Sequence, residues 1–225
     1  LLTSRGVPNI YYGTEQYVVP ADGSDVSGRI FMQTDSSFDT DTTAYKLIGK
    51  LSELRQQNDA IAYGTTTIRY SNDDVLIYER KFYDDVILVA INRQPDKAYT
   101  IDNVETLLPE GEYVDFLGGM LNGENISVYA STGINTTASI TLDGGEVGIW
   151  QYDAAANAPE IGNVVSTMGR AGNRVYIYGD GLDGNISVKL GATEATVESN
   201  TANEIVTHVP DNAVAAYNDI TVTTG

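Results

Sequence analysis

The fold of this chain is decided near its N-terminus by the stretch Gly6-Val7-Pro8-Asn9-Ile10-Tyr11-Tyr12-Gly13-Thr14-Glu15. An apolar run between Pro8 and Gly13 that leads to a carboxylate is typical of a buried strand that delivers polar groups to a site. Such a strand needs hydrogen-bonding neighbours on both sides, because its backbone groups have no other partners. The residues before it, 1–5, predict only the last turn of a helix that ends at Gly6. We therefore expect the chain to be the C-terminal part of a larger protein, and its start without Met agrees with this.

Residues 42–58 show the clearest helical pattern in the sequence. Asp39, Asp41 and Thr42 supply capping groups and favourable negative charge at the N-terminus of this helix. Residues 18–38, before the helix, are rich in Asp, Gly and Ser and predict a long loop. Strand, loop and helix together predict one βα unit. The apolar residues of the helix lie three and four positions apart and form a single stripe: Ala44, Leu47, Ile48, Leu51 and Leu54.

After residue 64 the sequence predicts only strands. From 65 to 152, short segments rich in Val, Ile, Tyr and Thr alternate with turn signals such as Asn122-Gly123, which indicates an antiparallel sandwich. A linker of small residues at 153–159 leads to a second, smaller sandwich with one strand fewer than an immunoglobulin-like domain normally has. Four strands are expected there, at Arg174–Tyr178, Ile186–Leu190, Glu204–Val209 and Asp219–Thr223.

Composition excludes several classes of partner. The net charge of the 225 residues is −18, with 31 acidic against 13 basic side chains, so the surface repels nucleic acid and anionic membranes. No apolar run approaches the length of a membrane span. The absence of cysteine excludes disulfides and thiolate metal sites. The acidic surface favours solubility, and adaptation to high salt stays open as a second interpretation.

Few residues are candidates for a catalytic or metal-binding role. His208 is the single histidine, lies at an expected strand end and is interpreted as a surface or half-buried residue. Residues 179–184 resemble a calcium loop in composition but lack its spacing, so a β-turn is expected. Hydrolysis of a glycoside needs two carboxylates on opposite sides of one sugar bond. Glu15, Asp22 and Asp25 all come from one strand and its loop, so Glu15 is interpreted as a structural residue.

Several motifs are specific enough to point to a family. They include Ile10–Tyr17, Thr43-Ala44-Tyr45-Lys46, Ile77-Tyr78-Glu79-Arg80, Leu88–Arg93, Leu121-Asn122-Gly123 and Gly145-Glu146-Val147. These motifs resemble the α-amylase family of glycoside hydrolases, and within it the cyclodextrin glucanotransferases and maltogenic amylases. From Ile161-Gly162 onward the chain is similar to the immunoglobulin-like fourth domain of these enzymes, of the IPT/TIG type.

The resemblance implies three parts. Residues 1–63 would be the C-terminal end of a (β/α)8 catalytic barrel, 64–153 an all-β C-terminal sandwich domain, and 158–225 a truncated immunoglobulin-like IPT/TIG domain. The expected fold class is therefore mainly β, with the last βα unit of the barrel followed by two antiparallel sandwiches.

The resemblance also implies a function. The parent would be a secreted, extracellular and monomeric enzyme that cleaves or transfers α-1,4-glucan such as starch by a retaining mechanism. The family's catalytic carboxylates and calcium ligands would precede Leu1. This segment would then hold no catalytic residue, metal site or cofactor of its own, and its partner would be the upstream remainder of the barrel. Two alternatives are a non-catalytic carbohydrate-binding or spacer segment, and an adhesion protein, against which the βα unit argues.

The resemblance implies two places in this chain that would contact sugar. Asp25 and Arg29 match the Asp and Arg of the family's Asp-Pro-x-Asn-Arg pattern, which holds a donor-side glucose, although the Pro and Asn of that pattern are replaced. The alternative interpretation is that Asp25 and Arg29 form an ion pair exposed to solvent. Tyr70 stands where the family has a Trp that forms a surface maltose platform, and its alternative is an ordinary edge-strand tyrosine. The sequence leaves the choice between cyclic and linear products open.

Overall fold

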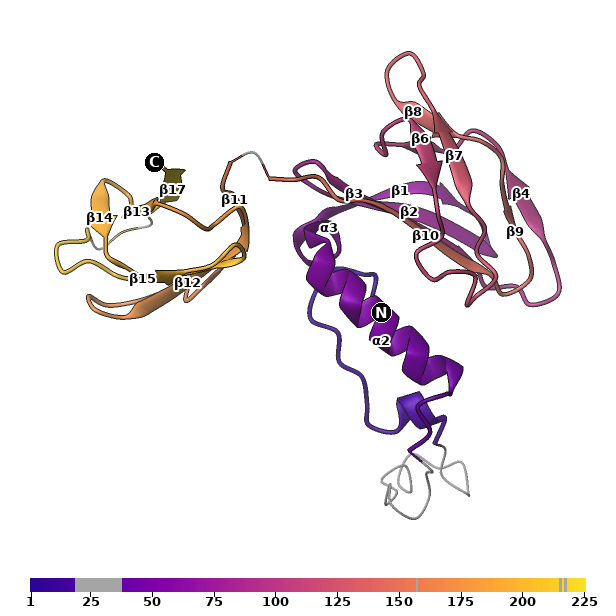
Figure 1. Cartoon of the computed structure of the whole chain (residues 1–225), viewed down its shortest axis with the longest axis horizontal. Coiled ribbons are helices and arrows are strands. Elements are labelled where there is room, and N and C mark those ends of the chain that lie inside the picture. Colours follow the sequence, from indigo (N-terminus) through magenta and orange to yellow (C-terminus); the bar gives the residue numbers. More distant parts are fainter. Residues whose placement is uncertain (19–37, 157, 215, 217) are drawn as a thin grey trace. The chain divides into compact units, whose positions relative to one another are not determined.

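The computed structural model describes residues 1–18, 38–156, 158–214, 216 and 218–225, which form two compact units (Figure 1). The first unit comprises Leu1–Lys81 and Asp85–Tyr152, and the second Phe82–Asp84 and Asp153–Gly225. Among the described residues, no helix combines the length and the apolar character needed to cross a membrane. The predicted loop at 18–38 falls almost entirely outside the described residues.

The strand predicted within Gly6–Glu15 is wrong for this chain. Residues 7–11 form no helix or strand and pair with no strand in the described part of the molecule, and a 3-10 helix, η1 (Thr14–Gln16), follows. Val7 is 96% exposed and Tyr11 56%. The physical reason is the absence of neighbouring strands, because an extended segment alone cannot satisfy its backbone groups. The predicted helical turn at residues 1–5 is instead a turn in which Ser4 N and Oγ donate to Leu1 O at 3.2 and 2.8 Å.

The predicted helix is confirmed as α2 (Thr43–Gln57), capped by Thr42, whose Oγ1 accepts a hydrogen bond from Tyr45 N at 3.1 Å. A short helix, α3 (Asp59–Tyr63), follows directly, and Asn58 caps it by accepting from Ala60 N at 3.0 Å. Within the apolar stripe of α2 only Leu54 is fully buried, and the other members are half-buried: Ala44, Leu47, Ile48 and Leu51.

The rest of the first unit is the predicted sandwich. One sheet has the order β1-β2-β3-β10, in which β1 pairs antiparallel with β2 and β3 with β10. The facing strands form a pair, β4-β9, and a sheet of order β5-β8-β7-β6 (Figure 1). The bounds are β1 (Thr65–Ser71), β2 (Val75–Phe82), β3 (Asp85–Asn92), β4 (Tyr99–Ile101), β5 (Glu105–Thr106), β6 (Gly111–Tyr113), β7 (Ile126–Tyr129), β8 (Asn135–Thr137), β9 (Ile140–Leu142) and β10 (Val147–Tyr152).

Strand β3 is buried on both faces. Val86 and Leu88 point into the sandwich core, where Trp150 of β10 also lies. Ile87 and Val89 are equally buried but face the other way, toward the side on which α3 packs. Two-sided burial explains why β3 is a nearly continuous apolar run rather than an alternating strand.

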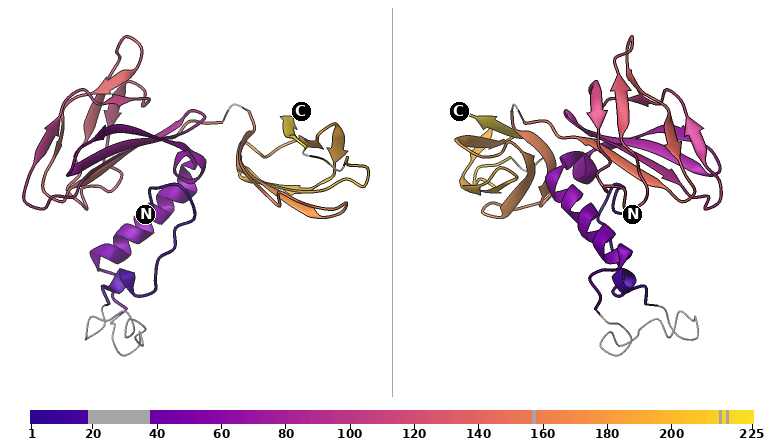
Figure 2. Two further views of the ribbon diagram at one scale, coloured as in Figure 1. Left: turned by 180° about the vertical axis from the view of Figure 1, so that it is seen from behind. Right: turned by 45° about the vertical axis from the view of Figure 1, so that its right-hand side comes forward.

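The second unit is a smaller two-sheet sandwich (Figure 2). Its core contains Val175, Ile177, Val188 and Ile205. The four strands predicted from the sequence are confirmed to within two residues at each end. One sheet has the order β11-β12-β16-β15 and the other β14-β13-β17, with bounds β11 (Glu160–Val165), β12 (Arg174–Asp180), β13 (Ile186–Leu190), β14 (Thr193–Ala195), β15 (Val197–Asn200), β16 (Glu204–His208) and β17 (Ile220–Thr224).

Candidate functional site

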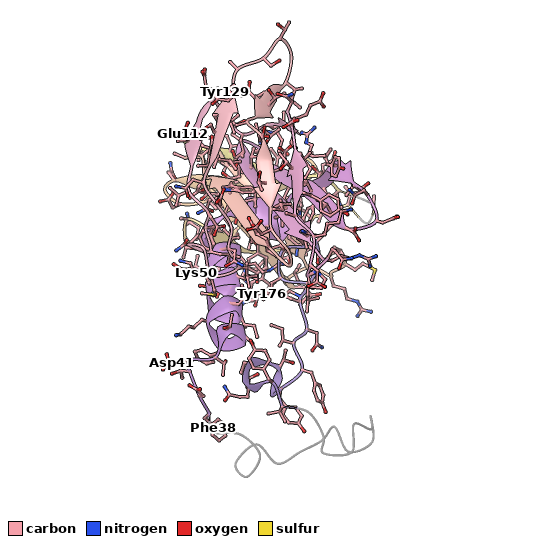
Figure 3. All side chains as sticks on the ribbon, turned by 90° about the vertical axis from the view of Figure 1, so that its right-hand side faces the viewer. Phe38, Asp41, Lys50, Glu112, Tyr129 and Tyr176 are labelled. Carbon is pink, nitrogen blue, oxygen red and sulfur yellow. The ribbon has the colours of Figure 1, made fainter. Side chains whose placement is uncertain are left out.

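The segment around η1 is bound to the N-terminus of α2. Gln16 Nε2 donates to Asp39 O at 2.9 Å, and Gln16 Oε1 accepts from Asp39 N at 2.7 Å. Thr42 Oγ1 donates to the carbonyl of Glu15 at 2.5 Å. The backbone of Glu15 is thus part of this contact, which agrees with its interpretation as a structural residue. This end of α2 is marked by Asp41 in Figure 3.

The first six residues are held by Arg55 of α2. Its Nη1 donates to Leu2 O at 2.8 Å and to Ser4 O at 3.1 Å, and its Nη2 donates to Gly6 O at 2.7 Å. The planar guanidinium holds its donors on separate nitrogens in fixed directions, and here Nη1 serves two carbonyls and Nη2 the third. Burial lowers the pKa of Arg55, because the charged guanidinium loses part of its hydration at this site.

Arg80 of β2 holds the same segment from the sandwich side. It is 0% exposed, and it donates to Gly64 O at 2.7 Å and to Thr3 O at 3.3 Å. Tyr78 donates to the hydroxyl of Thr3 at 2.6 Å. Burial lowers the pKa of Arg80, and Nε of Arg80 has no hydrogen-bond partner among the described residues.

Asp25 and Arg29, which the resemblance assigns to sugar binding, lie outside the described residues. Tyr70 lies on β1, half-buried and packed against the sandwich core. Its hydroxyl accepts from Asn72 Nδ2 at 3.1 Å. The Asn72 oxygen in turn accepts from Asp74 N at 2.8 Å and Val75 N at 2.7 Å, which fixes the turn between β1 and β2. Part of the Tyr70 ring is therefore covered by the sandwich core, and the turn beside it is held by hydrogen bonds from Asn72.

Tyr99 and Lys97 lie near this turn. Tyr99 donates to Asp74, and Lys97 Nζ donates to the Tyr99 hydroxyl at 2.7 Å and lies 4.3 Å from the centre of its ring. The hydrogen bond with Tyr99 raises the pKa of Lys97, so the amine stays charged. This arrangement places hydrogen-bond donors and acceptors, which bind sugar hydroxyls, beside an aromatic ring.

A buried ion pair stands beside Tyr70, and the sequence reasoning missed it. Arg69 Nη2 donates to Glu79 Oε1 at 2.5 Å, and their side chains are 10% and 1% exposed. Glu79 Oε2 also accepts from Thr106 Oγ1 and from Leu107 N, each at 2.7 Å. The signal available in the sequence was Glu79-Arg80-Lys81, three consecutive charges inside a strand that otherwise consists of aliphatic and aromatic residues.

His208 is half-buried at the end of β16, as predicted, with Nε2 3.3 Å from Glu198 Oε2. Within the described ranges no group of three or more acidic or histidine side chains is placed to hold a metal ion. Residues 181 and 184 are glycines at φ +62° and +80°, where the chain bends after β12.

Two family models match the chain. The first, described as the C-terminal all-beta domain of alpha amylase, matches residues 69–153, and the second, the IPT/TIG domain, matches residues 159–225.

Individual proteins match over nearly the whole chain. The cyclomaltodextrin glucanotransferase of Geobacillus stearothermophilus is 48% identical over 219 residues, and that of Thermoanaerobacterium thermosulfurigenes is 49% identical over 219 residues. These alignments cover 97% and 96% of this chain but 30% of each relative. The solved structure of gamma-CGTase from alkalophilic Bacillus clarkii matches with a TM-score of 0.86 and 42% identity, over 100% of this chain and 32% of that one.

Proposed function

Because this chain is homologous to a segment of the cyclomaltodextrin glucanotransferases and contains the C-terminal all-beta domain of the α-amylases followed by an IPT/TIG domain, we propose that it is part of a starch-acting enzyme. The observation that supports this most is the 48% identity that extends over 97% of the chain. Residues 1–63 would be the end of the catalytic barrel. The half-buried stripe of α2 and the unpaired segment 7–11 support this, because both are surfaces that neighbouring barrel elements would cover.

The parent enzyme would cleave or transfer α-1,4-glucan by a retaining mechanism, with its catalytic carboxylates upstream of Leu1. The resemblance implies that the calcium would be bound upstream of Leu1 too. The residues of this chain would then have a structural role in the parent enzyme. Arg55 and Arg80 fix residues 1–6 between helix and sandwich, so that the barrel end is held in one position. We further propose that the enzyme is secreted and monomeric.

Sugar contacts within this chain are proposed at Asp25, Arg29 and Tyr70. Asp25 and Arg29 would supply an acceptor and a donor fork to glucose hydroxyls. Tyr70 would supply an aromatic face on which a sugar can stack, and the amine of Lys97 a hydrogen-bond donor.

A chimaera tests the proposal. This chain would replace the matching segment of the Geobacillus stearothermophilus enzyme, which supplies the upstream barrel. We expect a folded chimaera that converts soluble starch and that loses glucan affinity on Arg29→Ala but not on Arg170→Ala, the matched control. A chimaera that folds and has no action on starch would contradict the proposal.

The alternative is a non-catalytic carbohydrate-binding or spacer segment, and the chain by itself tests it. We expect no cyclising or hydrolysing activity on starch from the 225 residues alone. In a gel that contains starch, we expect the chain to be retarded and Tyr70→Ala to reduce this retardation. Activity of the isolated chain would show that catalytic carboxylates lie within it after all.

A further inference from the structure

The outer face of the larger sheet of the second unit presents two tyrosines side by side on β12. Val175 and Ile177 point into the core, so Tyr176 and Tyr178 point away from it. Their rings are within 8° of parallel, with centroids 6.5 Å apart. Neither ring packs against the core cluster of this unit, and both are half-buried. Tyr176 is labelled in Figure 3.

Residues on the neighbouring strands extend this face. Direct cross-strand partners lie on the same side of a sheet. Val165 and Asn163 of β11 stand opposite Tyr176 and Tyr178, and both are exposed. The face therefore has two aromatic rings at its centre and an apolar and an amide side chain at one edge.

Fixed polar groups border the rings on the other side. Arg174 forms a bidentate pair with Glu198, at 2.8 Å from Nε and 2.6 Å from Nη2. His208 lies opposite Arg174 across the strands and also approaches Glu198. Hydrogen bonds with Glu198 and then with Tyr176 raise the pKa of Arg174. Donors and acceptors are thus held in place next to the aromatic pair.

This combination selects among ligand classes. Two parallel rings bind the flat apolar face of a pyranose, and mixed donors and acceptors bind its hydroxyls. A polyanion is disfavoured by Glu198 and Glu204 on this face and by the net charge of −18. Neutral oligosaccharide fits the surface best.

We propose that Tyr176 and Tyr178 form a second glucan-binding surface, on the IPT/TIG domain, bordered by Asn163, Arg174 and Glu198. The choice of α-1,4-glucan as the oligosaccharide rests on the proposed function of the chain. The proposal of a binding surface rests on the parallel tyrosine rings and the polar side chains beside them.

The test uses the full chain labelled with 3-fluorotyrosine and titrated with maltoheptaose, followed by fluorine NMR. The Tyr176 and Tyr178 resonances are assigned from Tyr176→Phe and Tyr178→Phe. We expect both resonances to shift along one binding curve. Tyr176→Ala and Tyr178→Ala should each weaken binding roughly tenfold, because the loss of one stacked ring is worth about that factor. The Phe variants, which keep the ring, should bind within about threefold of the parent.

Tyr129→Ala is the matched control, because Tyr129 is an exposed tyrosine on a strand of the other unit. It should leave the titration of Tyr176 and Tyr178 unchanged. Resonances of Tyr176 and Tyr178 that stay fixed, or a response to cellohexaose, heparin or a peptide in place of maltoheptaose, would overturn the proposal.

The two proposals fail separately. Retardation in a starch gel that depends on Tyr70 and persists in the Tyr176→Ala/Tyr178→Ala double variant would keep the proposed function and remove this surface. A chimaera without action on starch, combined with maltoheptaose shifts at Tyr176 and Tyr178, would remove the proposed function and keep the surface.

Discussion

Replacing Glu79 by glutamine is expected to destabilise the first unit strongly, because it breaks a buried ion pair from one side. The carboxylate is 1% exposed and accepts from Arg69, Thr106 and Leu107 at 2.5 to 2.7 Å. A glutamine can keep its oxygen toward Thr106 and Leu107, but its amide then meets the Arg69 guanidinium as donor against donor.

The magnitude follows from the burial of both partners. Arg69 would keep a charge that is 10% exposed and has lost its carboxylate, and its Nε already has no partner among the described residues. Breaking a buried pair in this way costs about 3–5 kcal/mol. With a urea slope of about 2 kcal/mol per molar, the unfolding midpoint should fall by roughly 2 M. The double replacement Arg69→Met/Glu79→Leu should recover much of this loss, because apolar residues avoid the desolvation of two charges.

Trp150 makes the assay specific to one unit. It is the single tryptophan of the chain and is buried in the core of the first unit, where its Nε1 donates to Glu124 O at 2.8 Å. Its fluorescence in urea therefore reports this unit alone. The control is Asp41→Asn, which removes the exposed pair with Lys46 and should leave the midpoint unchanged. A Glu79→Gln midpoint equal to that of the parent would refute the reasoning and show that water compensates the pair.

Three further outcomes are expected. Burial, and more weakly its acidic neighbours, raises the pKa of Glu146, so the folded unit favours the protonated carboxyl. The stability of the first unit should therefore fall as the pH rises from the ordinary glutamate pKa of about 4.3 through the raised pKa. Urea midpoints measured by Trp150 fluorescence should show this pH dependence in the parent chain and not in Glu146→Gln. Gly144→Ala should lower the free energy of unfolding by about 1–3 kcal/mol, because the added Cβ would lie 1.9 Å from the backbone oxygen of Pro95. The added Cβ of Gly49→Ala on α2 meets no atom within 4 Å, so this variant should raise the free energy of unfolding by about 0.5–1 kcal/mol in the same urea assay. Arg55→Lys should raise amide hydrogen exchange in residues 1–6 by roughly tenfold without moving the Trp150 midpoint, since the donors of an ammonium diverge from one nitrogen and do not reproduce the spread of Nη1 and Nη2 over the three carbonyls. Unchanged exchange would show that the segment is held by other contacts.

Local signals in the sequence predicted the elements whose causes are local. The stripe and the Thr42 cap of α2 lie within one helix, and the alternation Arg174-Val175-Tyr176-Ile177-Tyr178 lies within one strand. The strand expected within Gly6–Glu15 failed because a strand depends on partners, and the described residues supply none.

The candidate site was harder to predict for the same reason. The role of Glu79 depends on Thr106, 27 positions away, and the burial of Arg80 depends on Thr3, 77 positions away. No spacing rule connects such residues, since the contact exists only once the fold is formed. The outward direction of the β12 tyrosines follows from their alternation with buried aliphatic residues, but the parallel arrangement of their rings does not.

The contacts of Thr3 and Asn58 have a consequence for modular reuse of the sandwich. The family model begins at residue 69, yet the sheet is bonded to the backbone of Thr3 through Arg80 and to α3 through Asn58, whose Nδ2 donates to Tyr152 O at 3.2 Å. A graft cut at the sequence boundary would leave a guanidinium and a strand-end carbonyl without their partners. The transplantable module is therefore discontinuous: it consists of the strands together with the first six residues, Asn58 and the short helix α3.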